Sequence, residues 1–179
     1  MKTLNRIAAL LAAAALTISF CSCGKRSENK NMGGTVAATS EAATDSVCEK
    51  EQTTASEVLD KLSESGLCPE LDERADYGSD VFTNACDKLY SEPAESFSDG
   101  GIMFVSSGAA ADEISVLKSD SADCQKLLED RKQRRYKDFE GYAPAELDKI
   151  DKARIFEAGG LWILIISDKA EDAEKLICG

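Results

Sequence analysis

The amino-acid sequence predicts an α+β fold: a four-stranded antiparallel sheet built from two ββα units, with two additional N-terminal helices packed on it. Two strand-like runs followed by a helix-like run occur twice between residues 100 and 177. Strands joined by tight hairpins must be antiparallel. Between residues 55 and 90, apolar residues instead recur every three or four positions, which indicates amphipathic helices.

The two N-terminal helices are short. In the first, Val58, Leu59 and Leu62 form the apolar face, and the Gly and Pro of "SGLCP" end the helix. The second covers the run "SDVFTNACDKLY", in which apolar residues between positions 81 and 90 share one face. Because Cys86 lies on that face, we expect it to be a small buried residue.

The first ββα unit consists of "GGIMFVSSG", residues 100–108, then "EISVLK", residues 113–118, and then the long helix "SDSADCQKLLEDRKQRRYKDF". The second unit is the hairpin "ARIFEAGGLWILIIS" and the closing helix "DKAEDAEKLI". The glycine pair at 159–160 suits a type I′ turn. We interpret the pair at 100–101 as a turn as well, because neither pair extends into a phosphate-binding loop.

The run "LWILIIS", residues 161–167, is apolar on both of its faces, whereas "EISVLK" alternates. A strand buried on both faces is usually central in its sheet. We therefore expect this strand at the centre, with the two N-terminal helices covering the second face of the sheet.

The charge and composition exclude several classes of function. The chain of 179 residues has 21 basic and 33 acidic side chains, a net charge of −12, and no histidine. This balance repels phosphate backbones, so nucleic acid is not an expected partner. Without histidine, the usual general base, the usual zinc ligand and the usual activator of a nucleophile are missing. The sequence therefore predicts no catalytic residue, no cofactor and no metal site.

The N-terminus has the pattern of an export signal. Residues 1–6 are positively charged, and the apolar or small run "IAALLAAAALTISF" follows over 14 residues. That run is shorter than the roughly 20 apolar residues that span a bilayer, and it has the length of the apolar region of a signal peptide. We expect residues 1–22 to be removed on export.

Two cysteines follow the apolar run. Cleavage before Cys23 leaves Ser22, a small residue, at the cut, whereas cleavage before Cys21 leaves Phe20. The window "FCSC" resembles a bacterial lipobox, although Phe20 and Cys21 depart from its usual residues. This predicts Cys23 as the lipid attachment site, carrying acyl chains such as palmitate. The alternative is an ordinary secretory signal whose cysteines carry no lipid.

The residues after the signal predict a tether and one domain. Residues 23–54 are rich in small and polar residues, have no periodic apolar face, and are expected to stay flexible. Residues 55–179 are expected to form a single α+β domain. An acylated Cys23 would hold that domain on the extracytoplasmic face of the cell membrane, because each buried methylene contributes about 0.8 kcal/mol.

Five cysteines remain on the mature chain after Cys23: Cys48, Cys68, Cys86, Cys124 and Cys178. Their number is odd and no C-x-x-C pair occurs, which argues against a zinc ribbon or a dithiol redox site. The spacing leaves open whether any of them form disulfides.

A basic cluster, "DRKQRRYK", lies in the C-terminal half of the long helix. Such clusters can bind polyanions. We favour a solvated helix whose charges complement its dipole, with Arg131 and Arg135 laying their stems along the apolar stripe. A docking patch for an acidic envelope component is the alternative. We interpret the pair Asp112-Glu113 as acids at a strand start.

The C-terminal half resembles a known family. The "DEISVLK" strand, the basic helix ending in F-x-x-Y-x-P (Phe139, Tyr142, Pro144), the hairpin through "GGLWILIIS" and the terminal helix are similar to small lipoproteins of Firmicutes-type bacteria, catalogued as domain of unknown function four-three-five-eight. The resemblance covers residues 57–177, more loosely before residue 102. It implies a location and an architecture, and no catalytic residue.

Two hypotheses for the function follow. The first is a membrane-anchored, non-enzymatic surface lipoprotein that binds or scaffolds an unidentified envelope protein or ligand. The second is a histidine-free envelope enzyme that uses a carboxylate or a lone cysteine. A deep pocket that collects Glu113, Lys118 or Arg131 beside an exposed thiol would favour the enzyme, and a filled core with a flat charged surface would favour the binding module.

Overall fold

The computed structural model describes residues 47–48 and 53–179. The signal peptide, Cys23 and most of the expected tether therefore lie outside the described residues. In the described part the strands are β1 (Val47–Cys48), β2 (Glu73–Asp76), β3 (Asp99–Phe104), β4 (Glu113–Lys118), β5 (Arg154–Ala158) and β6 (Leu161–Ile166). They form one sheet in the order β1-β5-β6-β4-β3-β2.

Five α-helices lie between and after these strands along the described chain. They are α1 (Ala55–Ser65), α2 (Asp80–Tyr90), α3 (Cys124–Glu140), α4 (Leu147–Asp151) and α5 (Ala170–Cys178), with short 3-10 turns at Ala94–Ser96 and Pro144–Glu146. No helix in residues 53–179 is long and apolar enough to cross a membrane.

The α+β class and the antiparallel sheet are confirmed, but the prediction of four strands is wrong. Strands β2 to β6 pair antiparallel, so the antiparallel part has five strands. The sequence "ERAD" of β2 has a single apolar residue, Ala75, which is why periodicity did not reveal this edge strand. The two-residue β1, inside the expected tether, pairs parallel with β5.

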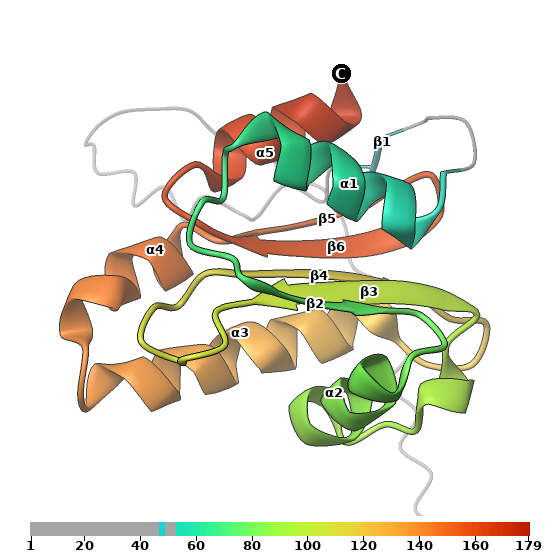
Figure 1. Cartoon of the computed structure of the whole chain (residues 1–179), viewed down its shortest axis with the longest axis horizontal. Coiled ribbons are helices and arrows are strands. Elements are labelled where there is room, and N and C mark those ends of the chain that lie inside the picture. Colours follow the sequence, from blue (N-terminus) through green and yellow to red (C-terminus); the bar gives the residue numbers. More distant parts are fainter. Residues whose placement is uncertain (1–46, 49–52) are drawn as a thin grey trace, which may run out of the picture. The chain divides into compact units, whose positions relative to one another are not determined.

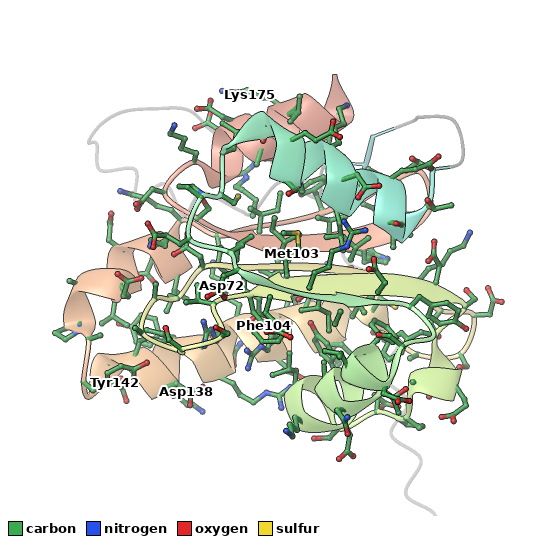
Figure 2. The ribbon with its side chains drawn as sticks, viewed as in Figure 1. Asp72, Met103, Phe104, Asp138, Tyr142 and Lys175 are labelled. Carbon is green, nitrogen blue, oxygen red and sulfur yellow. The ribbon has the colours of Figure 1, made fainter. Side chains whose placement is uncertain are left out.

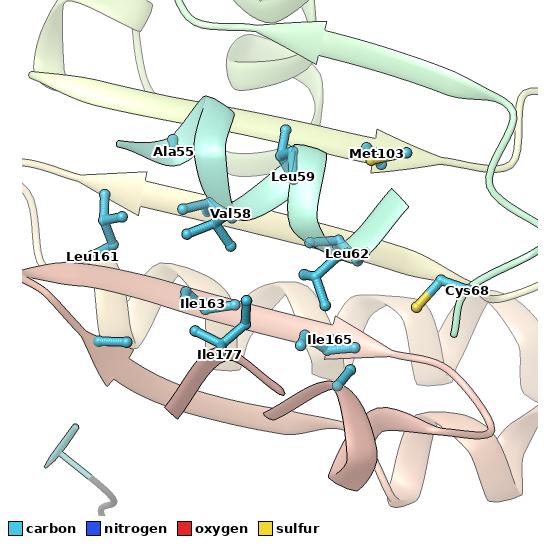
Figure 3. Packing of buried hydrophobic residues seen from close by; sticks show 14 of the residues in the cluster. Ala55, Val58, Leu59, Leu62, Cys68, Met103, Leu161, Ile163, Ile165 and Ile177 are labelled. Carbon is cyan, nitrogen blue, oxygen red and sulfur yellow. The ribbon is translucent and has the colours of Figure 1, made fainter. Parts of the chain in front are cut away.

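Each face of the sheet carries its own core (Figure 1). Alternate residues of β6 point to opposite faces: Ile163 and Ile165 pack with α1 and α5, and Leu164 and Ile166 pack with α2 and α3. As expected, β6 is central, between β5 and β4. Figure 3 shows α1 lying across the first of these cores, with Val58, Leu59 and Leu62 directed at the strands.

The placement of the N-terminal helices differs from the expectation that both cover the same face. Helix α1 packs with α5 on one face, whereas α2 packs with α3 on the other. The terminal helices of the two ββα units, α3 and α5, therefore also lie on opposite faces. The physical reason is that both faces of the sheet are apolar and each needs to be covered. Helices α3 and α5 each cover part of one face, and α2 and α1 complete the two cores.

The two glycine pairs have different roles. Gly159 and Gly160 have positive φ angles of 59° and 78° in the turn between β5 and β6, as predicted. The pair Gly100-Gly101 instead lies within β3, so its interpretation as a turn was wrong. A Cβ on Gly100 would come within 2.7 Å of Phe82 Cζ, and one on Gly101 within 2.6 Å of Leu59 Cδ1. These glycines let α2 and α1 approach the sheet closely from its two sides.

Candidate ligand-binding pocket

A buried carboxylate lies at the start of the central strand β4. Glu113 is completely buried, although its sequence position suggested an ordinary acid at a strand start. Its side chain points to the face covered by α2 and α3, where Arg131 of α3 holds it in a two-pronged ion pair. Arg131 Nε donates to Oε1 at 2.9 Å, and Nη2 donates to Oε2 at 2.5 Å. Such fork geometry is the strongest form of arginine–carboxylate pairing.

A short hydrogen-bond chain completes the environment of Glu113. The hydroxyl of Tyr90, from α2, donates to Ser115 Oγ at 2.6 Å, and Ser115 Oγ donates to Glu113 Oε1 at 3.1 Å. Burial and the Glu113 charge raise the pKa of Tyr90 well above its ordinary value, so the phenol stays a neutral donor. Both carboxylate oxygens of Glu113 are thus engaged by the protein itself.

A second guanidinium, that of Arg135, lies one helical turn beyond Arg131. Its Nη2 donates to the carbonyl of Ala110 at 3.1 Å, and its guanidinium lies 4.7 Å from the centre of the Phe139 ring. Arg135 Nε is 3.5 Å from Glu113 Oε2 and is the one buried side-chain polar atom in residues 53–179 without a hydrogen-bond partner.

Burial, more than a lack of nearby carboxylates, disfavours the charged form of Arg135. Burial lowers the pKa of Arg135, and Arg131 adds to this effect, while Glu113 opposes it. The pKa of Arg131 is instead raised, because its close contact with Glu113 outweighs its burial. One carboxylate therefore faces two cations and is shared unequally between them.

These charges line a cavity of about 290 Å³ between α2, α3 and the end of β3. Its walls are mostly apolar, and Figure 2 shows Phe104 on the side of the sheet that faces α3. The cavity-lining residues are Val81, Asn84, Ala85, Lys88, Leu89, Phe104, Val105, Glu113, Arg131 and Arg135, and we refer to this cavity as the arginine pocket.

A neighbouring ion cluster fixes the loop that precedes β4. Lys149 of α4 donates to Asp112 at 2.6 Å and to Glu146 at 3.0 Å, and Glu146 also accepts from the backbone N–H of Ala111 at 2.8 Å. Burial alone would lower the pKa of Lys149, but these hydrogen bonds raise it. This cluster holds the loop beside the arginine pocket, and its second carboxylate, Glu146, also acts electrostatically on Arg135.

The described thiols are not placed for chemistry. Cys68, Cys86 and Cys124 are buried and free, as expected for Cys86, and none of them lines the arginine pocket. Burial raises the pKa of Cys86 to about 12 and that of Cys124 to about 11, so neither forms a thiolate near neutral pH. Cys178 is disulfide-bonded, and its partner lies outside the described side chains.

A larger, open cavity of about 470 Å³ lies between α3, α4 and β5. Its two cations already have partners: Lys132 donates to the Asp151 carbonyl at 3.0 Å, and Arg154 pairs with Glu174 at 2.6 Å. This cavity has no uncompensated buried group among the described residues. No cluster of three or more potential metal-ligating residues occurs in the described part of the chain.

Sequence reasoning considered the right residues and missed their role. Arg131 and Arg135 do border the apolar stripe of α3, but they serve a buried carboxylate instead of a solvated surface. Glu113 came closest to being identified, as a member of a pocket with Arg131, whereas Lys118 does not line that pocket. One feature of the sequence could have indicated this site. Arg131 and Arg135 are four residues apart on the helix that follows the strand, and that strand begins with Glu113.

Comparisons with known proteins returned no match: no family model, no curated protein and no solved structure matches this chain. The resemblance to the lipoprotein family described above stays a prediction.

Proposed function

We propose that the protein is a lipid-anchored, non-enzymatic binding module on the extracytoplasmic face of the cell membrane, and that it binds a small anionic ligand in the arginine pocket. Cys23 carries the lipid, and the domain that begins near residue 55 carries the pocket. The observation that carries the binding proposal is the buried Nε–H of Arg135, which has no hydrogen-bond acceptor among the described residues, beside a preformed cavity.

Arg135 has a buried N–H group without an acceptor among the described residues. A buried N–H without an acceptor costs free energy of about 1–3 kcal/mol, and more when the group is charged. An anion in the arginine pocket would lie beside the guanidinium of Arg135 and stabilise its charged form. Lys88 lies on the same wall and adds a further positive charge at the entrance. The pocket thus attracts anions although the chain as a whole is acidic.

The same geometry supports binding over catalysis. Glu113 accepts hydrogen bonds on both oxygens from Arg131, and a carboxylate engaged in this way is poorly placed to take a proton from a substrate. The described thiols that could act as nucleophiles are buried and protonated. A pocket that holds charge without an available base or nucleophile is suited to recognition.

The anchor has a direct test. Metabolic labelling with an alkyne analogue of palmitate is expected to tag the wild-type protein and the Cys21→Ala variant, and to leave Cys23→Ala unlabelled, because only Cys23 follows a small residue at the cleavage point. Gel fluorescence of membrane fractions measures the label. Label that persists in Cys23→Ala would overturn the choice of cysteine, and the absence of label from all three proteins would overturn the anchor.

Anion binding can be observed at Arg135 itself. In the full mature protein, purified from membranes in detergent, titration with sodium acetate at constant ionic strength is expected to shift the Nε–H resonance of Arg135 in ¹H–¹⁵N spectra, because that N–H gains an acceptor. Arg135→Lys assigns the resonance by its disappearance. Arg134→Gln is the control, because Arg134 lies on the same helix but does not line the pocket.

We expect the Arg135→Gln variant to bind acetate more than tenfold more weakly than the wild-type protein. The reason is that a hydrogen bond to a charged group contributes about 1.5–3 kcal/mol. If neither acetate nor phosphate moves the Arg135 resonance in the folded wild-type protein, the binding proposal is wrong.

A further inference from the structure

We infer that the ligand of the arginine pocket is a small organic monocarboxylate with an apolar chain or ring. This inference rests on the proposed function and adds the chemical class of the ligand. Three independent properties of the pocket carry it: its net charge, the character of its walls and its size.

The charge of the pocket matches one negative charge at its base. Among the buried residues that line the pocket, Arg131 and Glu113 neutralise each other through their two-pronged contact, which leaves the positive charge of Arg135. Asp138 and Glu146 act on Arg135 from outside the lining. Lys88 lies on an exposed position of α2, where solvent screens its charge. A carboxylate fits the planar guanidinium group of Arg135. A phosphate dianion would bring a second charge into a site where the described residues offer no further buried cation to receive it.

The apolar walls of the pocket favour a ligand that carries an apolar group next to its carboxylate. Five of the ten lining residues are aliphatic or aromatic, and they come from both sides of the cavity: Val81, Ala85, Leu89, Phe104 and Val105. An inorganic anion would leave these side chains in contact with water. An organic acid would instead remove apolar surface from water on both partners, which is favourable in proportion to the area buried.

The size of the pocket limits the ligand. At about 290 Å³ it lies at the lower end of the range for small-molecule sites, which is roughly 300–1,000 Å³. The ligand is therefore a short acid and not a long acyl chain or a peptide. Because the cavity also opens beside Val81, which is an exposed side chain, the distal end of the ligand can approach solvent.

The test measures the affinity of the full mature protein, in detergent, for acids of increasing chain length: acetate, butanoate, hexanoate and dodecanoate. Hexan-1-ol and inorganic phosphate are measured in the same way to test the preference for a carboxylate head group. Each buried methylene is worth about 0.8 kcal/mol, or roughly a fourfold gain in affinity. Hexanoate is thus expected to bind on the order of 100-fold tighter than acetate, and dodecanoate no tighter than hexanoate. Hexan-1-ol should bind more than tenfold more weakly than hexanoate.

Two variants separate the head-group contact from the wall contact. Arg135→Gln is expected to weaken acetate and hexanoate alike. Leu89→Ala, which trims a half-buried wall residue, is expected to flatten the chain-length dependence and to leave acetate affinity nearly unchanged. Binding constants come from titration calorimetry, with detergent micelles alone subtracted because longer acids enter micelles.

The outcomes distinguish this inference from the proposed function. If phosphate binds more tightly than hexanoate, or if affinity does not depend on chain length while acetate still shifts the Arg135 resonance, the monocarboxylate inference is wrong and the proposed function stands. If no anion binds in a manner that depends on Arg135, both are wrong.

Discussion

Replacing Arg131 with methionine is expected to lower the free energy of unfolding by about 3–5 kcal/mol, because it removes one partner of a buried ion pair. Glu113 is completely buried, and the variant would leave its carboxylate with only Ser115 and the distant Arg135 Nε. The loss therefore comes from the charged hydrogen bonds that Arg131 makes to a buried carboxylate, because Arg135 Nε, at 3.5 Å, makes no hydrogen bond to it. Urea unfolding, followed by circular dichroism, measures it as a lower midpoint with an unchanged slope.

A double variant tests whether the loss of stability depends on the carboxylate of Glu113. In Arg131→Met/Glu113→Gln the buried carboxylate is gone, and the new amide oxygen can still accept the hydrogen bond from Ser115. We expect the double variant to recover part of the stability, with a coupling free energy between about 0.5 and 3 kcal/mol. Recovery is only partial because Arg135 loses the carboxylate beside it. The control is Lys126→Met, which breaks the exposed pair between Lys126 and Asp130 on the same helix and should leave the midpoint nearly unchanged. If the urea midpoint of Arg131→Met equals that of Lys126→Met, the buried ion pair between Arg131 and Glu113 does not stabilise the fold as predicted.

Truncating Phe82 is the second change with a large expected effect. The Phe82→Ala variant should lose about 3–5 kcal/mol of unfolding free energy, because it removes a fully buried ring and leaves a cavity. The ring lies against Gly100 of β3 and makes edge contacts with Tyr77 at 5.6 Å and Phe97 at 6.2 Å between ring centroids. It therefore links α2 to β3.

The close approach of Phe82 to Gly100 provides an internal check. Gly100→Ala alone should destabilise the protein, because the new Cβ would come within 2.7 Å of the ring. In the Phe82→Ala background that clash disappears, so the same Gly100→Ala change should cost much less. Asp87→Ala, at an exposed position of α2, is the control and should change stability by less than about 0.5 kcal/mol. Strict additivity of the two substitutions would show that α2 does not pack on β3 as described.

The Phe82 prediction also bears on binding, because α2 supplies half of the arginine pocket. A residue such as Leu89 can line a cavity only if the helix is held at a fixed distance from β3, and Phe82 and Gly100 set that distance. Rigid support of this kind is what keeps a binding site preformed. The pocket is thus a consequence of core packing and not a separate feature of the surface.

Local patterns predicted the parts of the fold that depend on local interactions. The apolar faces of α1 and α2, the turn at residues 159–160 and the central position of β6 follow from spacing, glycine conformation and continuous apolarity. The strand β2 and the glycines inside β3 were not predicted. In both cases the side chains carry almost no apolar signal, and the backbone is placed by a neighbouring strand and by helices from elsewhere in the chain.

By itself, the sequence determined the composition that disfavours histidine chemistry, the helical and strand periodicities, and the prediction of an exported, lipid-anchored chain. Only the tertiary structure decided which face of the sheet each helix covers, and that choice creates the candidate site. Glu113 and Arg131 are 18 residues apart and belong to different elements, so no local pattern links them. They meet because α3 crosses the face of the sheet on which Glu113 is buried, where low solvent access makes their charges, and the unpaired N–H of Arg135, energetically significant.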